Sequence, residues 1–178
     1  MSELAAFLGV SVGGTIPAIR FFGPRPRFIQ YMAANYRGRL LFEIGAGAGH
    51  VARALADSGL RITALDLYHQ DFEEFPIIIA DATAYTYARD SVVMFCRPSH
   101  EGFVGKTIER ALKCGVSEIL YVGLPVNRRH DLGCYSIGFR RILIDVGRKR
   151  ENVYRMCRKD STAEFEHSSA EVKLRVSR

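Results

Sequence analysis

Short apolar runs alternate with segments of helical periodicity through the middle of the chain. Strands are predicted over residues 40–44, 61–67, 76–80, 91–96 and 118–122, and helices over residues 28–36, 51–58 and 102–114. Apolar strands that alternate with helices are typical of a parallel sheet buried on both faces. The pattern therefore predicts an α/β fold, with a mostly parallel sheet and helices on both of its faces.

The pattern changes towards both ends of the chain. Two β-rich runs, 139–146 and 151–157, flank a glycine and three basic residues, and they predict a C-terminal antiparallel hairpin. Residues 15–27 contain three prolines and are expected to be irregular. For a chain of 178 residues we therefore expect an N-terminal arm over 1–27, one domain over 28–160 and a polar tail over 161–178.

Positive charge is concentrated in the C-terminal part. The net charge is +6, and residues 128–178 hold 13 basic and 7 acidic side chains, whereas residues 1–127 hold 12 of each. The densest basic stretch is 140–159. It has two interpretations, a surface for RNA or another anionic partner and a solvated, charge-protected edge hairpin.

Composition sets limits on the compartment and on metals. The N-terminus has no basic stretch before an apolar one, and no apolar run approaches the roughly 20 residues of a membrane span. The four cysteines form no C-x-x-C pair, so no metal site is predicted. We expect a cytoplasmic protein with reduced thiols and no membrane partner.

Glycines stand at alternate positions between the strand at 40–44 and the helix that follows. Residues 43–50 read Glu-Ile-Gly-Ala-Gly-Ala-Gly-His. Glycine permits a tight turn and close approach of a ligand to the backbone, and the helix start offers unpaired amides. Asp66 stands at the end of the next strand, where a carboxylate can accept hydrogen bonds from ribose hydroxyls. The segment therefore predicts a site for a nucleotide or nucleoside.

A dinucleotide fits these glycines poorly. Its fingerprint is G-x-G-x-x-G/A, and counting from Gly45 places His50 at the third glycine position. Counting from Gly47 reaches Ala52 but moves the first glycine into the turn. The acidic Glu43 is also unfavourable beside a pyrophosphate.

Three segments together resemble the class I S-adenosylmethionine-dependent methyltransferases. Residues 42–49 resemble that family's glycine motif, Asp66 its ribose-binding acid, and Asp81 the acid that receives the adenine amino group. The resemblance covers about residues 28–157 and implies a doubly wound, Rossmann-like sheet with S-adenosylmethionine as cofactor. The cofactor-binding residues that it implies are Glu43, Gly45, Ala46, Gly47, Gly49, Asp66, Leu67, Asp81, Ala82 and Cys96.

The chemistry of this cofactor agrees with the acids. S-adenosylmethionine has no phosphate and carries an ammonium and a sulfonium group, so Glu43 is favourable near its methionyl end. Each acid also has a structural alternative. Glu43 suits a capping or ion-pair role, Asp66 a turn or cap, and Asp81 the N-cap of the next segment.

The loop after strand 91–96 faces substrate in this family, and here it reads Cys-Arg-Pro-Ser-His. In the Asp/Asn-Pro-Pro-Tyr/Phe pattern of amino-methylating enzymes, only Pro98 fits. The catalytic candidates are His100 and Arg97. His100 is a candidate general base, and Arg97 is a candidate ligand for an anionic substrate group. Pro98 and Asn127 are the substrate-binding candidates. The alternatives are a polar helix start for His100, an ion pair for Arg97 and a turn for Asn127.

The expected function is methyl transfer from S-adenosylmethionine to a small molecule or RNA. Two other functions remain open: a non-catalytic Rossmann-like module or partner subunit, and RNA binding through residues 140–159. A homodimer is one expected assembly. The identity of the acceptor does not follow from the sequence.

Overall fold

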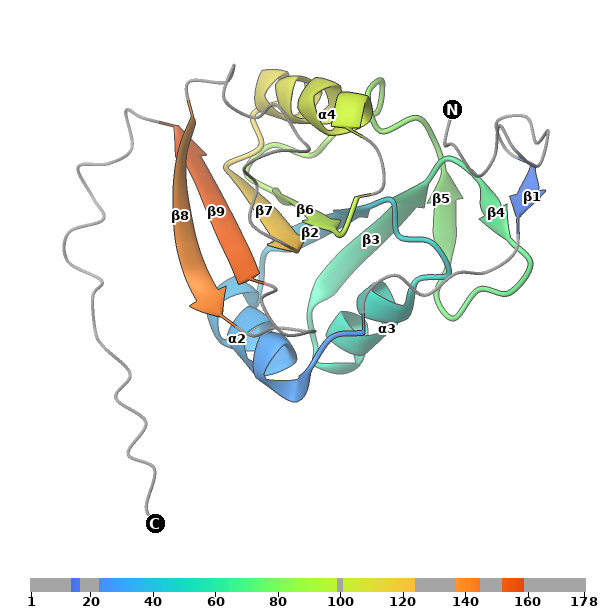
Figure 1. Ribbon diagram of the computed structural model, residues 1–178, viewed down its shortest axis with the longest axis horizontal. Helices are drawn as coiled ribbons and strands as arrows, with labels where there is room; N and C mark the ends of the chain where they lie inside the picture. The colour runs from blue at the N-terminus through green and yellow to red at the C-terminus, as the bar shows by residue number, and fades with distance from the viewer. Residues whose placement is uncertain (1–13, 17–22, 99–100, 124–136, 145–151, 159–178) are drawn as a thin grey trace, which may run out of the picture.

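Seven strands form one sheet in a computed structural model that describes residues 14–16, 23–98, 101–123, 137–144 and 152–158. The strand order is β5-β3-β2-β6-β7-β9-β8 (Figure 1). The strands are β2 (Leu40–Ile44), β3 (Arg61–Asp66), β5 (Ile77–Ile79), β6 (Val92–Cys96), β7 (Glu118–Gly123), β8 (Ile137–Ile144) and β9 (Asn152–Arg158). The first five in this order are parallel, and β9 is antiparallel to both of its neighbours.

The predicted fold class is confirmed, including the antiparallel strands at the C-terminal end. The hairpin strands begin and end at slightly different residues from those predicted, because β8 starts at Ile137 and β9 ends at Arg158. The pairing of β8 with β9 shifts register between Arg141 and Leu143. A bulge of this kind strengthens the twist of an edge strand.

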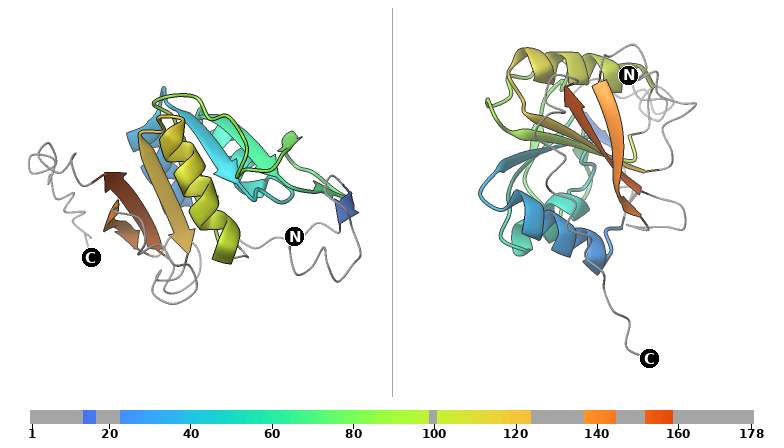
Figure 2. Two further views of the ribbon diagram at one scale, coloured as in Figure 1. Left: turned by 90° about the horizontal axis from the view of Figure 1, so that it is seen from above. Right: turned by 90° about the vertical axis from the view of Figure 1, so that its left-hand side faces the viewer.

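Helices cover both faces of the sheet, as predicted. Helices α2 (Pro26–Tyr36) and α3 (His50–Asp57) lie on one face and α4 (Glu101–Lys113) on the other (Figure 2). Helix α2 begins two residues before the predicted start, at a proline in its first turn. Proline is tolerated there because its missing N–H would have no partner within the helix.

The two faces of β6 belong to different hydrophobic clusters. Val92 and Met94 pack in the cluster that contains residues of α2 and α3, and Val93 and Phe95 pack in the cluster that contains residues of α4. All five residues of this strand are buried. This two-sided burial explains why the strand is an uninterrupted apolar run in the sequence.

A second, two-stranded sheet was not predicted. It pairs β1 (Thr15–Ile16) in parallel with β4 (His69–Gln70) and lies towards the β5 end of the main sheet (Figure 1). β1 falls within the residues expected to be irregular. The remainder of the expected arm up to residue 22 and the tail over 161–178 lie outside the described residues, so the division into arm, domain and tail stays a prediction.

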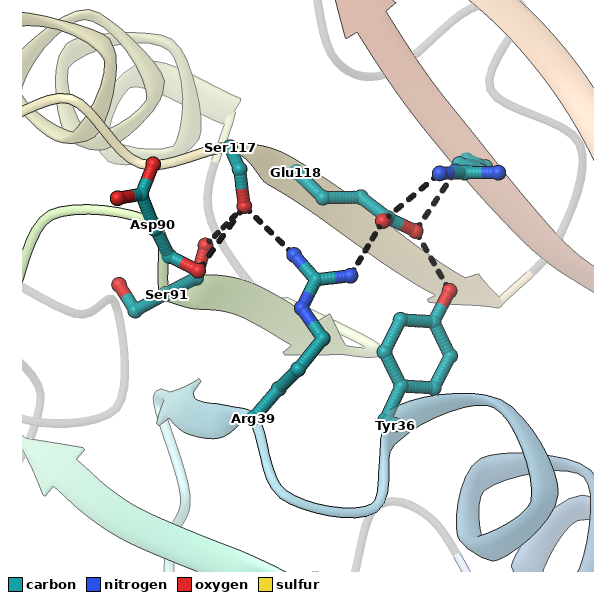
Figure 3. Close-up of polar contacts among 7 residues, drawn as sticks. Tyr36, Arg39, Asp90, Ser91, Ser117 and Glu118 are labelled. Carbon is teal, nitrogen blue, oxygen red and sulfur yellow. Dashed lines mark hydrogen bonds and ion pairs between the residues drawn. The ribbon is translucent and has the colours of Figure 1, made fainter. Parts of the chain in front are cut away.

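A buried carboxylate joins four parts of the chain where the parallel strands begin. Glu118 is 3% exposed and accepts hydrogen bonds from the Tyr36 hydroxyl at 2.5 Å and from Arg39 Nη1 at 2.9 Å. Arg155 of β9 places Nε 2.7 Å from Glu118 Oε1 and Nη2 3.0 Å from Oε2. Arg39 also donates to Ser117 Oγ at 2.6 Å (Figure 3). These contacts connect α2, the α2–β2 turn, β7 and β9.

The same contacts bear on the two interpretations of the basic stretch at 140–159. Arg155 belongs to that stretch, and its guanidinium is paired with a buried carboxylate rather than presented to an anionic partner. The charge of Arg155 therefore has a structural role within the sheet, and this residue does not favour an RNA-binding surface.

Candidate functional site

The glycine-rich loop, residues 45–49, connects the end of β2 to the start of α3. Gly45, Gly47 and Gly49 have φ angles of +68°, +57° and +80°, in the left-handed region where side chains other than hydrogen are strained. The alternating glycines are therefore required by the backbone path of the loop.

Amides of this loop already donate to the protein. Gly45 N and Ala46 N donate to Leu65 O at 2.9 and 3.0 Å, and Gly47 N donates to Asp66 Oδ2 at 2.8 Å. Gly49 N donates to Ala46 O at 3.0 Å. A pyrophosphate site needs such amides to point at the ligand. The loop therefore does not have the donor arrangement of a dinucleotide site.

Glu43 lies beneath the loop and is 1% exposed. Within the part of the chain that the structure describes, its Oε2 has no hydrogen-bond partner. Burial raises the pKa of this carboxyl to about 8, although the Ala52 amide and the Cys96 side chain favour the charged form, and the nearby charge of Asp66 raises the pKa further. A buried, unpaired carboxylate oxygen is costly unless a donor or a cation satisfies it.

Asp66 ends β3 and stabilises the loop directly. Its Oδ2 accepts from Gly47 N, and its Oδ1 accepts from Tyr68 N at 3.2 Å. Burial raises the pKa of Asp66, and these backbone amides oppose the shift. A carboxylate has about four acceptor positions, so both oxygens can still accept a hydroxyl. Leu67, the next residue, packs with Tyr68 and Ile16.

Asp81 follows β5 and caps a turn. Its Oδ1 accepts from Thr83 N at 2.8 Å and from Thr83 Oγ1 at 2.7 Å, and its backbone oxygen accepts from Tyr85 N at 3.0 Å. The neighbouring Ala82 accepts a hydrogen bond from the Tyr87 hydroxyl at 2.7 Å. Asp81 therefore has a capping role, as the structural alternative for this residue expected. Its side chain is exposed, so the carboxylate stays accessible to a ligand.

The segment after β6 begins with an unusual backbone conformation. Arg97 has a φ of +53° and its amide donates to Val122 O at 2.8 Å, which ties the ends of β6 and β7 together. A left-handed non-glycine residue is strained and needs such support. Arg97 and Pro98 are half-buried, and Cys96 is buried beside Glu43.

The proposed base and one substrate contact cannot be placed. His100 and Asn127 lie outside the described residues, so their roles stay predictions. The carboxyl ends of β2, β3, β5 and β6 bring Glu43, Asp66, Asp81 and Arg97 to one edge of the sheet, where ligands bind in open α/β folds.

Sequence reasoning missed the segment that packs against the second half of the loop. The connection between β3 and β5 brings Phe75 to Gly49, where an added Cβ would lie 2.7 Å from Phe75 Cβ. Glu74 N donates to Ala48 O at 2.7 Å. The only sign of this contact in the sequence is the third glycine of the motif. A glycine there is consistent with a close neighbour but does not identify Phe75.

Replacing Gly49 with alanine is expected to lower the free energy of unfolding by about 2–3 kcal/mol, because left-handed strain adds to the contact with Phe75. Gly38 is the matched control. It has a φ of +84° but nothing within 4 Å of an added Cβ, so Gly38→Ala is expected to cost about 1 kcal/mol from strain alone. Urea unfolding of both variants measures the difference. Equal losses would show that Phe75 moves aside without cost.

The described ranges contain neither a candidate membrane span nor a candidate metal site. No helix there is long and apolar enough to cross a membrane. Within the same residues, no group of three His, Cys, Asp or Glu side chains is placed to hold a metal ion.

Comparisons with known proteins identify the fold. No family model and no curated protein matches the chain. Magnesium protoporphyrin IX methyltransferase from Synechocystis PCC 6803, solved with bound SAM, is 13% identical, with 74% of this chain and 78% of that chain covered and a TM-score of 0.53. Precorrin-6y C5,15-methyltransferase from Geobacter metallireducens GS-15 is 12% identical, with 80% and 94% covered and a TM-score of 0.54.

A third similar structure is that of an enzyme named for a different class of substrate, an RNA. The 23S rRNA methyltransferase ErmE is 15% identical, with 79% of this chain and 70% of that chain covered and a TM-score of 0.52. The chain therefore has the Rossmann-like fold of the class I S-adenosylmethionine-dependent methyltransferases, as the motifs predicted.

Proposed function

We propose that this chain binds S-adenosylmethionine at the glycine-rich loop and transfers its methyl group to a small molecule or RNA. The observation that carries the proposal is Glu43, a buried carboxylate with an unpartnered oxygen beneath a loop in which four of the five amides already have acceptors. A site rich in acceptors suits a cationic ligand without phosphate.

The residues present fit the cofactor. Glu43 would bind the positively charged methionyl end, Asp66 the ribose hydroxyls and Asp81 the adenine amino group. The glycines have no side chain, so they would allow the adenosyl group to approach the backbone. Another residue type at Gly45 or Gly47 would also have to adopt a strained left-handed conformation. The similar magnesium protoporphyrin IX methyltransferase has been solved with bound SAM, which supports the same cofactor here.

The protein's contribution to the reaction is mainly positioning. When bound, the cofactor supplies a methyl group on a positively charged sulfur. Glu43 and Asp66 would fix its two ends, which aligns the methyl group with an acceptor in the region of Pro98. His100 would remove a proton from an acceptor that carries one, and Arg97 and Asn127 would orient it.

Titration calorimetry with S-adenosylmethionine and with NAD tests the cofactor. Binding of the former with little or no affinity for NAD is the expected result, because four of the five loop amides already donate within the protein and do not point at a pyrophosphate. A preference for NAD would contradict the proposal. The variants His100→Ala and Arg97→Ala help to distinguish a methyltransferase from a non-catalytic module. A non-catalytic module is favoured if both variants bind the cofactor as the wild type does and the wild type methylates no acceptor.

Cofactor binding at pH 7 is expected to release a proton from Glu43. With a pKa of about 8, this carboxyl is mostly protonated at pH 7 in the ligand-free protein, and a bound cation lowers its pKa. The release should be about 0.9 proton greater for the wild type than for Glu43→Gln. Calorimetry in buffers of different ionisation enthalpy measures this difference. Equal proton release by both proteins would show that Glu43 does not titrate on binding.

The acceptor, the cytoplasmic location and the homodimer stay predictions. RNA binding through residues 140–159 would appear as an affinity that falls steeply with salt. Arg155 is paired with Glu118, so we expect the other basic residues of this stretch to carry such binding.

A further inference from the structure

The glycine-rich loop is held by two different parts of the chain. Its first half is fixed by β3, through Leu65 O and the Asp66 carboxylate. Its second half, residues 48 and 49, contacts the β3–β5 connection, which we define as residues 67–76. The two halves therefore depend on separate contacts, and each can be weakened without removing the other.

The β3–β5 connection makes two contacts with the second half of the loop and a third with the start of α3. Glu74 N donates to Ala48 O at 2.7 Å, and Phe75 packs against Gly49 so closely that no Cβ fits between them. Glu74 Oε2 also lies 2.7 Å from Nδ1 of His50, the first residue of α3. The His50 side chain is 14% exposed and that of Glu74 is 32% exposed, so the pair is partly shielded from water.

The connection is itself fixed at its other end. His69 N donates to Gly14 O at 3.0 Å and Asp71 N donates to Ile16 O at 2.9 Å, which pairs β4 with β1. Tyr68 is buried against Ile16, and its amide donates to Asp66. The connection therefore contacts the loop at one end and β1 at the other, and a segment held in this way can restrain the loop.

Such restraint matters because the loop contains three glycines with positive φ. Glycine loses more conformational freedom on ordering than any other residue, so an unrestrained loop would lose that freedom when a ligand binds. We propose that Glu74, through its contacts with His50 and Ala48, is a positioning residue that holds the second half of the glycine-rich loop in its cofactor-binding conformation. This inference rests on the proposed function.

The chain supplies a matched control one residue away. Glu73 faces His69 at 3.4 Å within the same connection, in a longer pair whose histidine is 52% exposed, compared with 14% for His50. Glu74→Gln and Glu73→Gln each remove one negative charge from the same segment. The first alters the contact with α3, and the second leaves that contact in place.

Binding of S-adenosylhomocysteine by calorimetry is the first measurement. Glu74→Gln and His50→Gln are each expected to weaken binding about tenfold. The first keeps an acceptor but removes the charge that strengthens this partly shielded hydrogen bond, and the second removes the imidazole that faces the carboxylate. The double variant should be no more than about twofold weaker than either single variant, because both remove the same interaction. Glu73→Gln should remain within about twofold of the wild type. Equal effects of the variants at 73 and 74 would overturn the proposal.

Hydrogen exchange in the ligand-free protein is the second measurement, and it does not need a bound cofactor. The amides of residues 48–53 should exchange faster in Glu74→Gln, while those of β6 and β7 exchange as in the wild type. Unchanged exchange at residues 48–53 overturns the proposal. If the wild type binds no S-adenosylhomocysteine, the proposed function fails, and the exchange result alone then supports or overturns the role of Glu74.

Discussion

Replacing Glu43 with glutamine is expected to weaken S-adenosylmethionine binding about 100-fold and, at alkaline pH, to stabilise the ligand-free protein. The loss of affinity follows because the cation then faces a neutral amide in a buried site. The gain in stability follows because the variant no longer buries a charge without a partner. Calorimetry and thermal unfolding measure the two effects separately.

The stability effect has a defined dependence on pH. Folding raises the pKa of Glu43 from about 4.5 to about 8, so between these values the folded protein holds a proton that the unfolded chain has lost. The contribution of Glu43 to stability is therefore fully present below pH 4.5 and is lost as the pH rises through 8. The variant should resemble the wild type in acid and melt at a higher temperature at pH 9.

Two outcomes would contradict this account. A Glu43→Gln protein that binds the cofactor like the wild type would show that the carboxylate does not contact the cation. A difference in melting temperature that is the same at pH 6 and pH 9 would show that Glu43 does not titrate in this range. A matched acid elsewhere, Asp57→Asn at the exposed end of α3, should change neither quantity appreciably.

Removing the carboxylate of Glu118 is expected to produce the largest loss of stability. Glu118→Ala leaves the Arg39 and Arg155 guanidinium groups without their shared partner and removes the acceptor of the Tyr36 hydroxyl. Breaking a buried ion pair from one side costs about 3–5 kcal/mol. A melting temperature lower by about 10 °C is the corresponding result for a domain of this size.

The surface pair Arg53–Asp57 provides the comparison for this variant. Its side chains are 59% and 60% exposed, so Asp57→Asn should cost less than about 0.5 kcal/mol. Glu118→Gln should fall between the two, since the amide keeps an acceptor for Tyr36 but loses the charge. If Glu118→Ala and Asp57→Asn have similar unfolding free energies, burial does not strengthen the Glu118 cluster.

The sequence predicted the central strands well because β2, β6 and β7 are almost entirely buried. β6 is entirely buried, so its five residues are all apolar and the run is unmistakable. β1 and β4 have two residues each, which is too short for any periodicity, and they were missed. The N-terminus of α2 was placed two residues late because Pro26 resembles a loop residue as much as a helix start.

The site was predicted in part for a related reason. The glycines, Glu43 and Asp66 lie close together in sequence or at strand ends, so their proximity followed from a parallel sheet. The partners that fix them did not. Phe75 meets Gly49 across 26 positions of the chain, and Arg155 meets Glu118 across 37. Neither pairing has a local signature, because both depend on how the connections fold back.

The order of the last two strands has a consequence for synthesis on the ribosome. β8 is made before β9, yet β9 lies between β8 and β7 in the sheet. A nascent chain that has exposed β8 therefore cannot extend its sheet beyond β7 until β9 has emerged as well. Arg155 arrives with β9, so the second of the two guanidinium groups that pair with Glu118 reaches it at that same late stage of translation, after Arg39.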